Sequence, residues 1–388
     1  MEMPSRWQAV REQFPLLESW TYLNSATFGP VPLCARAAAA AYFERCDEHA
    51  SLDFLDWFSD ADEIRAKAAR LINADPGDIA FIPNAGAALG WLINGIAWKP
   101  GDEILGLHGE FPNNLYYPKV LEQRGVRFVE MPLPDGEFSL DDFLARISDS
   151  TRLVMLSSVN YSSGLRPPLK EIGEALRGHP ALFYVDGTQS LGALRMDVRA
   201  IGADVLVGHG YKWLLCPTGI GFACVGPSVR EWLEPSIYSW RSHRNWREVD
   251  SLHHGCPELP CSAMKYEGGV QNFPGIYAMG AALDLLFSIG PEEIENRVLE
   301  LVNQTRDVLR RRGGRLLSDR HPHYGSAIVA AEFPGVEMPV LALELKRHRV
   351  AVAARKGRLR VSPHCFNNGA DLESLDEALG RFLPSARA

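Results

Sequence analysis

Short apolar runs alternate along most of the chain with longer segments whose apolar residues recur at helical spacing. Seven of the runs have the length and flanking residues of buried strands, at 78–83, 102–107, 126–131, 153–159, 182–186, 204–208 and 219–225. Helical segments follow between them, among them 84–98 and 139–147. This alternation predicts an α/β fold with a mainly parallel seven-stranded sheet that helices cover on both faces.

The pattern outside these strands is largely helical. Helices are expected at 5–18, 31–48, 52–73, 276–289, 291–312 and 339–347. Strands around 327–333 and 349–353 would join the last helices in a smaller α+β domain. Because 388 residues exceed what one compact core normally holds, we expect a large domain at 19–280 and a small domain made of 1–18 and 281–388.

Composition and charge narrow the class of protein. Hydrophobic residues make up 46% and charged residues 23% of the sequence, which is ordinary for a globular protein. The net charge of −8 argues against a nucleic-acid surface. We expect no membrane span, because no apolar run approaches ~20 residues, and no signal peptide, because MEMPSRWQAVREQF lacks an apolar core. The seven cysteines lack CxxC spacing, which favours a reduced cytoplasmic protein without a zinc site.

The stretch 185–225 holds the most informative chemistry. Asp186 follows one apolar run, and Lys212 follows the next. If these runs are adjacent parallel strands, both side chains lie at the sheet edge where ligands bind in open α/β folds. An amine beside a carboxylate suits pyridoxal phosphate (PLP), whose aldehyde forms a Schiff base with a lysine and whose ring nitrogen needs a carboxylate partner. The alternative is a surface lysine after a strand and an aspartate that caps a turn. Gln189 could then donate to the phenolic oxygen of the ring.

The segments VDGTQSLGALRMDV and ADVLVGHGYKWLLCPTGIGF resemble class V aminotransferase-fold enzymes, in particular cysteine desulfurases and isopenicillin N epimerase. GYKW also resembles kynureninase. The resemblance implies a fold type I PLP-dependent transferase architecture and a Schiff base on Lys212. It also implies that His209 and Tyr211 hold the cofactor phosphate, although a buried, hydrogen-bonded histidine is the alternative for His209.

Two further segments match cofactor contacts of this family. The turn that opens with Asn84 contains Ala85, Gly86 and Ala87, small residues that let a phosphate approach the N-terminus of a helix. Many strand–helix turns have this composition, and hydroxyl residues common in the family are missing here. Phe111 stands where the family places a ring over one face of the cofactor; a core phenylalanine is the alternative.

The remaining candidates also come from the resemblance. NYSSG resembles a segment of kynureninase and places Asn160 or Tyr161 towards the cofactor or substrate. YLN includes Asn24, near the substrate, and RLRVSPHCFNN provides Arg360 as the two-pronged partner of the substrate α-carboxylate. In KYEGGVQNFPG, Val270 replaces a threonine that reaches the phosphate of the partner subunit, so only its backbone N–H could bind there. We therefore expect a homodimer.

The resemblance implies an enzyme that acts on an α-amino acid, and it leaves the reaction open. Elimination, including C–S cleavage, and epimerisation are favoured, with an aminotransferase or a kynureninase-like hydrolase as alternatives. A non-catalytic PLP- or amino-acid-binding protein is a further alternative, which the intact Lys212, Asp186, Gln189 and Arg360 argue against. A persulfide-forming desulfurase is not expected, because the residues before Arg360, LKRHRVAVAARKGRL, contain no cysteine and look too short for a mobile loop.

Overall fold

A seven-stranded sheet forms the centre of the protein. The computed structural model describes residues 6–319 and 322–383. The sheet has the order β2-β8-β7-β6-β5-β3-β4, and β8 runs antiparallel to the other six strands, which are parallel to one another. The prediction of a mainly parallel sheet is therefore confirmed. The strands are β2 Ile79–Ile82, β3 Glu103–Leu107, β4 Arg127–Met131, β5 Thr151–Ser157, β6 Leu182–Asp186, β7 Val205–His209 and β8 Gly221–Val225.

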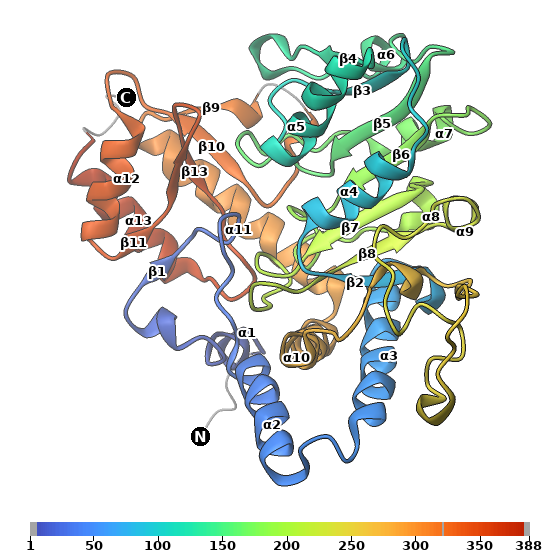
Figure 1. Cartoon of the computed structure of the whole chain (residues 1–388). Helices are drawn as coiled ribbons and strands as arrows, with labels where there is room; N and C mark the ends of the chain where they lie inside the picture. Colours follow the sequence, from blue (N-terminus) through green and yellow to red (C-terminus); the bar gives the residue numbers. More distant parts are fainter. Residues whose placement is uncertain (1–5, 320–321, 384–388) are drawn as a thin grey trace.

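Helices cover both faces of this sheet (Figure 1). Alternate residues of each strand point to opposite faces, so Phe183 and Val185 of β6 belong to one apolar cluster and Leu182 and Tyr184 to another. Helices α4 Ala85–Gly95 and α5 Pro112–Leu121 pack in the cluster of Tyr184. The opposite cluster includes α3 Phe54–Leu71, α7 Leu169–Ala175, α8 Val198–Ile201 and α10 Phe273–Ile289.

A second, antiparallel sheet lies in the C-terminal part of the chain, with the order β12-β13-β10-β9. Its strands are β9 Arg315–Leu316, β10 Val329–Glu332, β12 Ala353–Arg355 and β13 Arg358–Val361, and its helices are α11 Pro291–Arg311, α12 Met338–Arg347 and α13 Gly369–Gly380. This is the smaller α+β unit that the sequence predicts. The division into 19–280 and 1–18 plus 281–388 stays a prediction.

The N-terminal segment joins the C-terminal unit to the large sheet (Figure 1). Strand β1 Thr21–Tyr22 pairs with β11 Val350–Ala351, and Asn24 bridges to Ser362. The chain then passes the Lys212 turn, where the Gly29 N–H donates to the Tyr211 carbonyl at 2.8 Å. A Cβ at Gly29 would lie 2.0 Å from the Lys212 carbonyl oxygen, so only glycine allows this approach.

The N-terminal helix is shorter than the sequence predicts. Helix α1 spans Arg6–Arg11, and a separate 3₁₀ turn covers Pro15–Glu18. Proline has no N–H to donate and clashes with the preceding turn, so a helix cannot continue through Pro15. The other helices of the large unit are α2 Leu33–His49, α6 Leu140–Leu144 and α9 Pro227–Arg230.

Within the described residues, no single helix has both the length and the apolar character needed to cross a membrane; α10 and α11 pass that test only together, as a pair bent by 79°.

The long irregular segment at 236–260 is held against α3 by a buried ionic cluster. Glu267 accepts hydrogen bonds from the guanidinium groups of Arg65 and Arg241, and from the Phe81 N–H at 2.8 Å. All three charged side chains are at most 4% exposed. The Arg241 guanidinium also stacks on the Trp246 ring, 4.8 Å from its centroid. The cluster therefore ties α3, the end of the large sheet and this segment together.

We predict that Glu267→Ala lowers the free energy of unfolding by about 3–5 kcal/mol, because it removes the carboxylate shared by two buried guanidinium groups and leaves Arg241 without an acidic partner. Urea unfolding followed by tryptophan fluorescence measures the loss. Asp284→Ala is the matched control: it breaks an exposed pair with Lys67 and should cost about 0–1 kcal/mol. Equal losses in the two variants would contradict the structural role of Glu267.

Candidate active site

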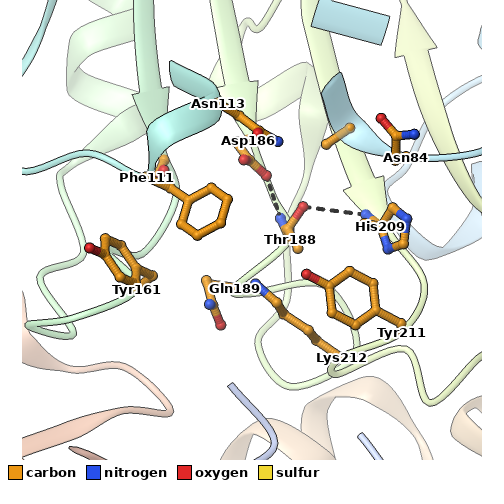
Figure 2. A pocket seen from close by; sticks show the side chains of 12 residues that line it. Asn84, Phe111, Asn113, Tyr161, Asp186, Thr188, Gln189, His209, Tyr211 and Lys212 are labelled. Carbon is orange, nitrogen blue, oxygen red and sulfur yellow. Dashed lines mark hydrogen bonds between the residues drawn. The ribbon is translucent and has the colours of Figure 1, made fainter. Parts of the chain in front are cut away.

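A pocket opens at the carboxyl ends of β6 and β7 in the large sheet. Figure 2 shows its side chains pointing towards a common space. Eight of its twelve lining residues are predicted site residues, and the sequence did not identify the other four, Asn84, Asn113, Ser157 and Thr188. The lining residues are Asn84, Ala85, Phe111, Asn113, Ser157, Tyr161, Asp186, Thr188, Gln189, His209, Tyr211 and Lys212.

The register of β6 and β7 determines where the Asp186 carboxylate lies in the pocket. Asp186, the last residue of β6, pairs with Val207 of β7. Its Oδ1 accepts a hydrogen bond from the Thr188 N–H at 2.9 Å, and Thr188 Oγ1 accepts one from the His209 N–H at 3.3 Å (Figure 2). These two bonds hold the Asp186 carboxylate at the end of its strand. Thr188 therefore positions the carboxylate, a role that was not predicted from the sequence.

Lys212 lies in the turn that follows β7, with its side chain in the pocket. Burial lowers its pKa to about 8; Asp186 acts in the opposite direction, and the guanidinium groups of Arg360 and Arg355 add to the lowering. The amine lies 5.5 Å from the Phe111 ring centroid and 5.4 Å from that of Tyr211. A lysine of this kind is partly neutral near pH 8, which is the form that attacks a carbonyl.

His209 presents an unsatisfied nitrogen in the same pocket. Its Nε2 lies 2.9 Å from the Pro83 carbonyl and must donate, because a carbonyl only accepts. Nδ1 is buried without a partner, and burial lowers the pKa of the ring. In the neutral ring Nδ1 is an acceptor. It can donate to a phosphate only if the ring takes up a second proton, which a bound dianion favours.

The phosphate side of the pocket also includes the N-terminus of α4. Asn84 caps this helix by accepting from the Ala87 N–H at 3.0 Å. Ala85 lines the pocket, while Gly86 and Ala87 lie beside it in the first turn. Tyr211 packs against His209, with 4.3 Å between the ring centroids. The helix end, His209 and Tyr211 together form a site suited to an anion.

Arg360 is buried beside the pocket and has no carboxylate partner among the described residues. Its Nη1 donates to the Tyr161 carbonyl at 2.7 Å, and its Nη2 donates to Asn24 Oδ1 at 3.3 Å and to Thr27 Oγ1. Burial, followed by the charge of Arg355, lowers its pKa to about 9. Its Nε has no hydrogen-bond partner. A buried guanidinium held only by neutral oxygens favours the binding of an anion.

Two predicted residues, Gln189 and Asn160, already have hydrogen-bond partners within the protein, and a third, Val270, lies outside the pocket of its own chain. Gln189 lines the pocket, but its amide donates to the Ala26 carbonyl at 3.1 Å and accepts from the Trp213 indole N–H at 2.9 Å. The Asn160 amide donates to the Gly109 carbonyl at 2.9 Å and stabilises its own turn, outside the pocket lining. Val270 is 74% exposed and does not line the pocket. Their roles stay predictions.

A second carboxyl group lies behind Asp186. Glu110 is fully buried and accepts hydrogen bonds from the Ser157 N–H at 2.8 Å and the Asn114 amide at 3.1 Å. Burial raises its pKa, and the nearby Asp186 charge acts in the same direction. Because Glu110 precedes Phe111, these bonds fix the loop that brings the Phe111 ring to the pocket. Nothing in the spacing of the sequence indicates that Glu110 reaches β5.

The comparisons with known proteins agree with this geometry. The family model for aminotransferase class V matches residues 22–371. The chain belongs to the class V aminotransferase family. It is 26% identical to a probable cysteine desulfurase of Methanothermobacter thermautotrophicus, over 96% of this chain and 97% of the relative. It is 28% identical to isopenicillin N epimerase of Streptomyces clavuligerus, with the same two coverages.

Solved structures show the same fold. A cysteine desulfurase of Thermococcus onnurineus matches with a TM-score of 0.87 and 21% identity, over 99% of this chain and 98% of that one. The cystine C–S lyase C-DES matches with a TM-score of 0.88 and 22% identity, over 96% of this chain and all of that one. The predictions of a fold type I architecture, of the family and of a PLP-dependent enzyme are thus confirmed.

The residues present suit PLP. The pocket combines a buried amine of lowered pKa, a carboxylate at the end of a strand, an unpartnered buried imidazole nitrogen and the N-terminus of a helix. Lys212 would bind the aldehyde carbon, Asp186 the ring nitrogen, and His209 with the start of α4 the phosphate. Among the described residues, no cluster of histidine, cysteine, aspartate and glutamate suits a metal ion.

We predict that capture of PLP by the apoprotein rises with pH with a midpoint near 8. Only the neutral amine attacks an aldehyde, and Lys212 loses its proton near that pH, whereas an exposed lysine does so at about 10.4. Borohydride reduction after short incubation, followed by peptide mass spectrometry, measures the labelled Lys212. The Lys212→Ala variant is the control. A midpoint above pH 10, or equal specific labelling of another lysine in that variant, would contradict the assignment.

Proposed function

We propose that the enzyme is a lyase that eliminates a sulfur substituent from the β-carbon of an α-amino acid. The observation that carries the proposal is the composition of the pocket: within the described structure it contains one amine, Lys212, and no cysteine. Elimination needs only a base for the α-proton and an acid for the leaving sulfur. Transfer of sulfur to the enzyme would need a thiolate as well.

The residues of the pocket would divide this work among themselves. Bound PLP supplies the electron sink for the charge that develops at Cα. Arg360 would bind the α-carboxylate in a two-pronged pair, and Asp186 would hold a proton on the cofactor ring nitrogen. Lys212 Nζ would take the proton from Cα and give it to the leaving sulfur as the Cβ–S bond breaks. Release of the unsaturated product and its hydrolysis would yield pyruvate, ammonia and a thiol or sulfide.

The chain before Arg360 supports elimination over persulfide formation. Strands β12 and β13 are joined by Lys356 and Gly357 alone, both with positive φ (48° and 76°). This is a two-residue hairpin rather than a loop that could carry a thiol. The nearest cysteines, Cys216 and Cys365, are buried. Burial raises the pKa of both thiols, that of Cys365 to about 12, so neither is a thiolate at neutral pH.

The products of the holoenzyme test the proposal. With L-cystine, L-cysteine and S-alkyl cysteines we expect pyruvate and ammonia in equal amounts, together with the sulfur leaving group. Trapping of protein thiols and peptide mass spectrometry should find no persulfide on Cys216 or Cys365. A turnover-competent persulfide would overturn the proposal. An amino acid recovered with its carbon skeleton intact and Cα inverted would instead support epimerisation, which the match to isopenicillin N epimerase and the RLRVSPH segment favour as second candidate.

We further propose a cytoplasmic homodimer. Ile237, 56% exposed, lies beside Gly268, and Trp240, 37% exposed, lies beside Gly269, the residue before Val270. Together with Val270, which is 74% exposed, they offer apolar surface of the kind that is typical of interaction sites. The seven cysteines are all free, which suits a reducing compartment.

Light scattering tests the dimer at micromolar concentration. We expect the mass of two chains for the unmodified protein and a shift towards the monomer for Val270→Asp, because a charge cannot be buried there without a partner. Val340→Asp, on the exposed side of α12, is the matched control and should leave the mass unchanged. A fully active monomer would show that Val270 has no role across an interface.

A further inference from the structure

The C-terminal sheet turns an excess of positive charge towards the active site. Arg355, Arg358 and Arg360 occupy positions of one sheet face, because Arg355 pairs with Arg358 in the register and Arg360 lies two residues further on. Arg358 is neutralised by Glu332, at 2.9 Å. Arg355 and Arg360 have no carboxylate partner in the described part of the chain.

Neutral oxygens alone hold Arg355. Its Nη1 donates to the carbonyl of the adjacent Ala354 at 2.8 Å, and its Nη2 lies 3.4 Å from Thr27 Oγ1. The same Thr27 oxygen accepts from Arg360. One hydroxyl therefore links the two guanidinium groups, and like charges are held close together.

A third cation stands at the rim of the pocket. Lys356 occupies the hairpin turn, and its amine lies 3.4 Å from the Gly109 carbonyl and 5.9 Å from the ring centroid of Tyr161. Tyr161 lines the pocket, and Gly109 begins the loop that carries Phe111. Lys356 is exposed and has no acidic partner among the residues described, so its charge is free to meet a ligand.

The positive charge of Arg355 affects the ionisation of two residues of the site. Arg355 contributes to lowering the pKa of both Arg360 and Lys212. Repulsion of this kind is unfavourable unless a negative group occupies the space between the cations. The α-carboxylate of an amino acid would neutralise Arg360 only, and it would leave Arg355 and Lys356 unmatched.

We infer that the substrate is an α-amino acid with a second anionic group at the end of its side chain, bound by Arg355 and Lys356. This inference rests on the proposed function for the site in which it is placed. The α-carboxylate would pair with Arg360, and a carboxylate or an oxidised-sulfur acid on the sulfur substituent would lie towards Arg355. Arg355 and Lys356 are thus specificity-determining residues.

Two isosteric substrates test the inference with the holoenzyme. S-carboxymethyl-L-cysteine carries the second anion, and S-carbamoylmethyl-L-cysteine replaces it with a neutral amide. Because hydrogen bonds to charged groups discriminate strongly, kcat/KM should favour the acid by about 10- to 100-fold. The difference should lie mainly in KM. S-sulfo-L-cysteine, compared with the carboxymethyl substrate, identifies which acid fits better, and preference for either over the amide supports the inference.

Variants of the β12–β13 hairpin identify the residues that cause the preference for the acidic substrate. In Arg355→Gln the ratio of kcat/KM for acid over amide should fall close to 1, and in Lys356→Asn, which suits positive φ, it should fall part of the way. Arg358→Gln removes a charge of the same hairpin that Glu332 already neutralises, and it should keep the ratio of the unmodified enzyme. Equal kcat/KM for acid and amide in the unmodified enzyme, or loss of the preference in Arg358→Gln alone, would overturn the inference.

A binding measurement separates this inference from the proposed reaction. Calorimetry with the holoenzyme should show glutarate binding about tenfold more tightly than its monoamide, and Arg355→Gln should remove the difference. If these ligands discriminate but no cysteine conjugate is cleaved, the proposed reaction fails while the dianionic preference stands. If conjugates are cleaved but neither substrates nor ligands discriminate, the reaction stands and the preference is wrong.

Discussion

The parallel pairing of β6 with β7 is the constraint on which the active site depends. It brings Asp186 and the turn carrying Lys212 to one sheet edge, although 26 residues separate them in the sequence. The turn is then closed by backbone contacts that leave no room for side chains. Gly192 has φ of +101°, and a Cβ there would lie 2.2 Å from the Trp213 carbonyl oxygen. The lysine is consequently fixed by packing around its backbone, while its amine stays free to react.

Charge is distributed unevenly around that amine. Asp186 and the buried Glu110 lie on the side of the large sheet, whereas Arg360 and Arg355 approach from the C-terminal unit. A ligand with a positive ring end and a negative outer end therefore has one favourable orientation. Lys212 lies between the two groups of charges and responds to both, since Asp186 favours its protonated form and the arginines oppose it. The lowered pKa of the lysine is thus a property of the whole interface between the two units, with burial as its largest cause.

The sequence predicts those parts of the molecule that depend on local pattern. The apolar runs place β6 at the observed bounds and β3 within one residue, because buried parallel strands are rich in apolar side chains. The edge strand β4 is also found within one residue, although it is only partly buried. The local pattern does not predict which side chains meet across the fold, because their partners lie far away in the sequence. Gln189 meets Ala26 from 163 positions away, and Glu110 meets Ser157 from 47. The helix expected over 5–18 fails for a local reason that could have been seen, since Pro15 interrupts it.

The hairpin before Arg360 connects the architecture to the choice of reaction. A fold of this family presents the same lysine and carboxylate to any amino acid that binds, so the fold alone does not select the outcome. The outcome depends instead on the protein group that contacts the substrate's substituent beyond Cβ. Here the turn consists of two residues, Lys356 and Gly357. The cationic side chains of Arg355 and Lys356 therefore lie where a longer loop could have presented a thiol. A cation can bind and orient an acidic substituent, but it cannot accept sulfur. The short turn therefore links the two proposals: it favours elimination over sulfur transfer to the enzyme, and it places Lys356 where a second acidic group of the substrate could bind.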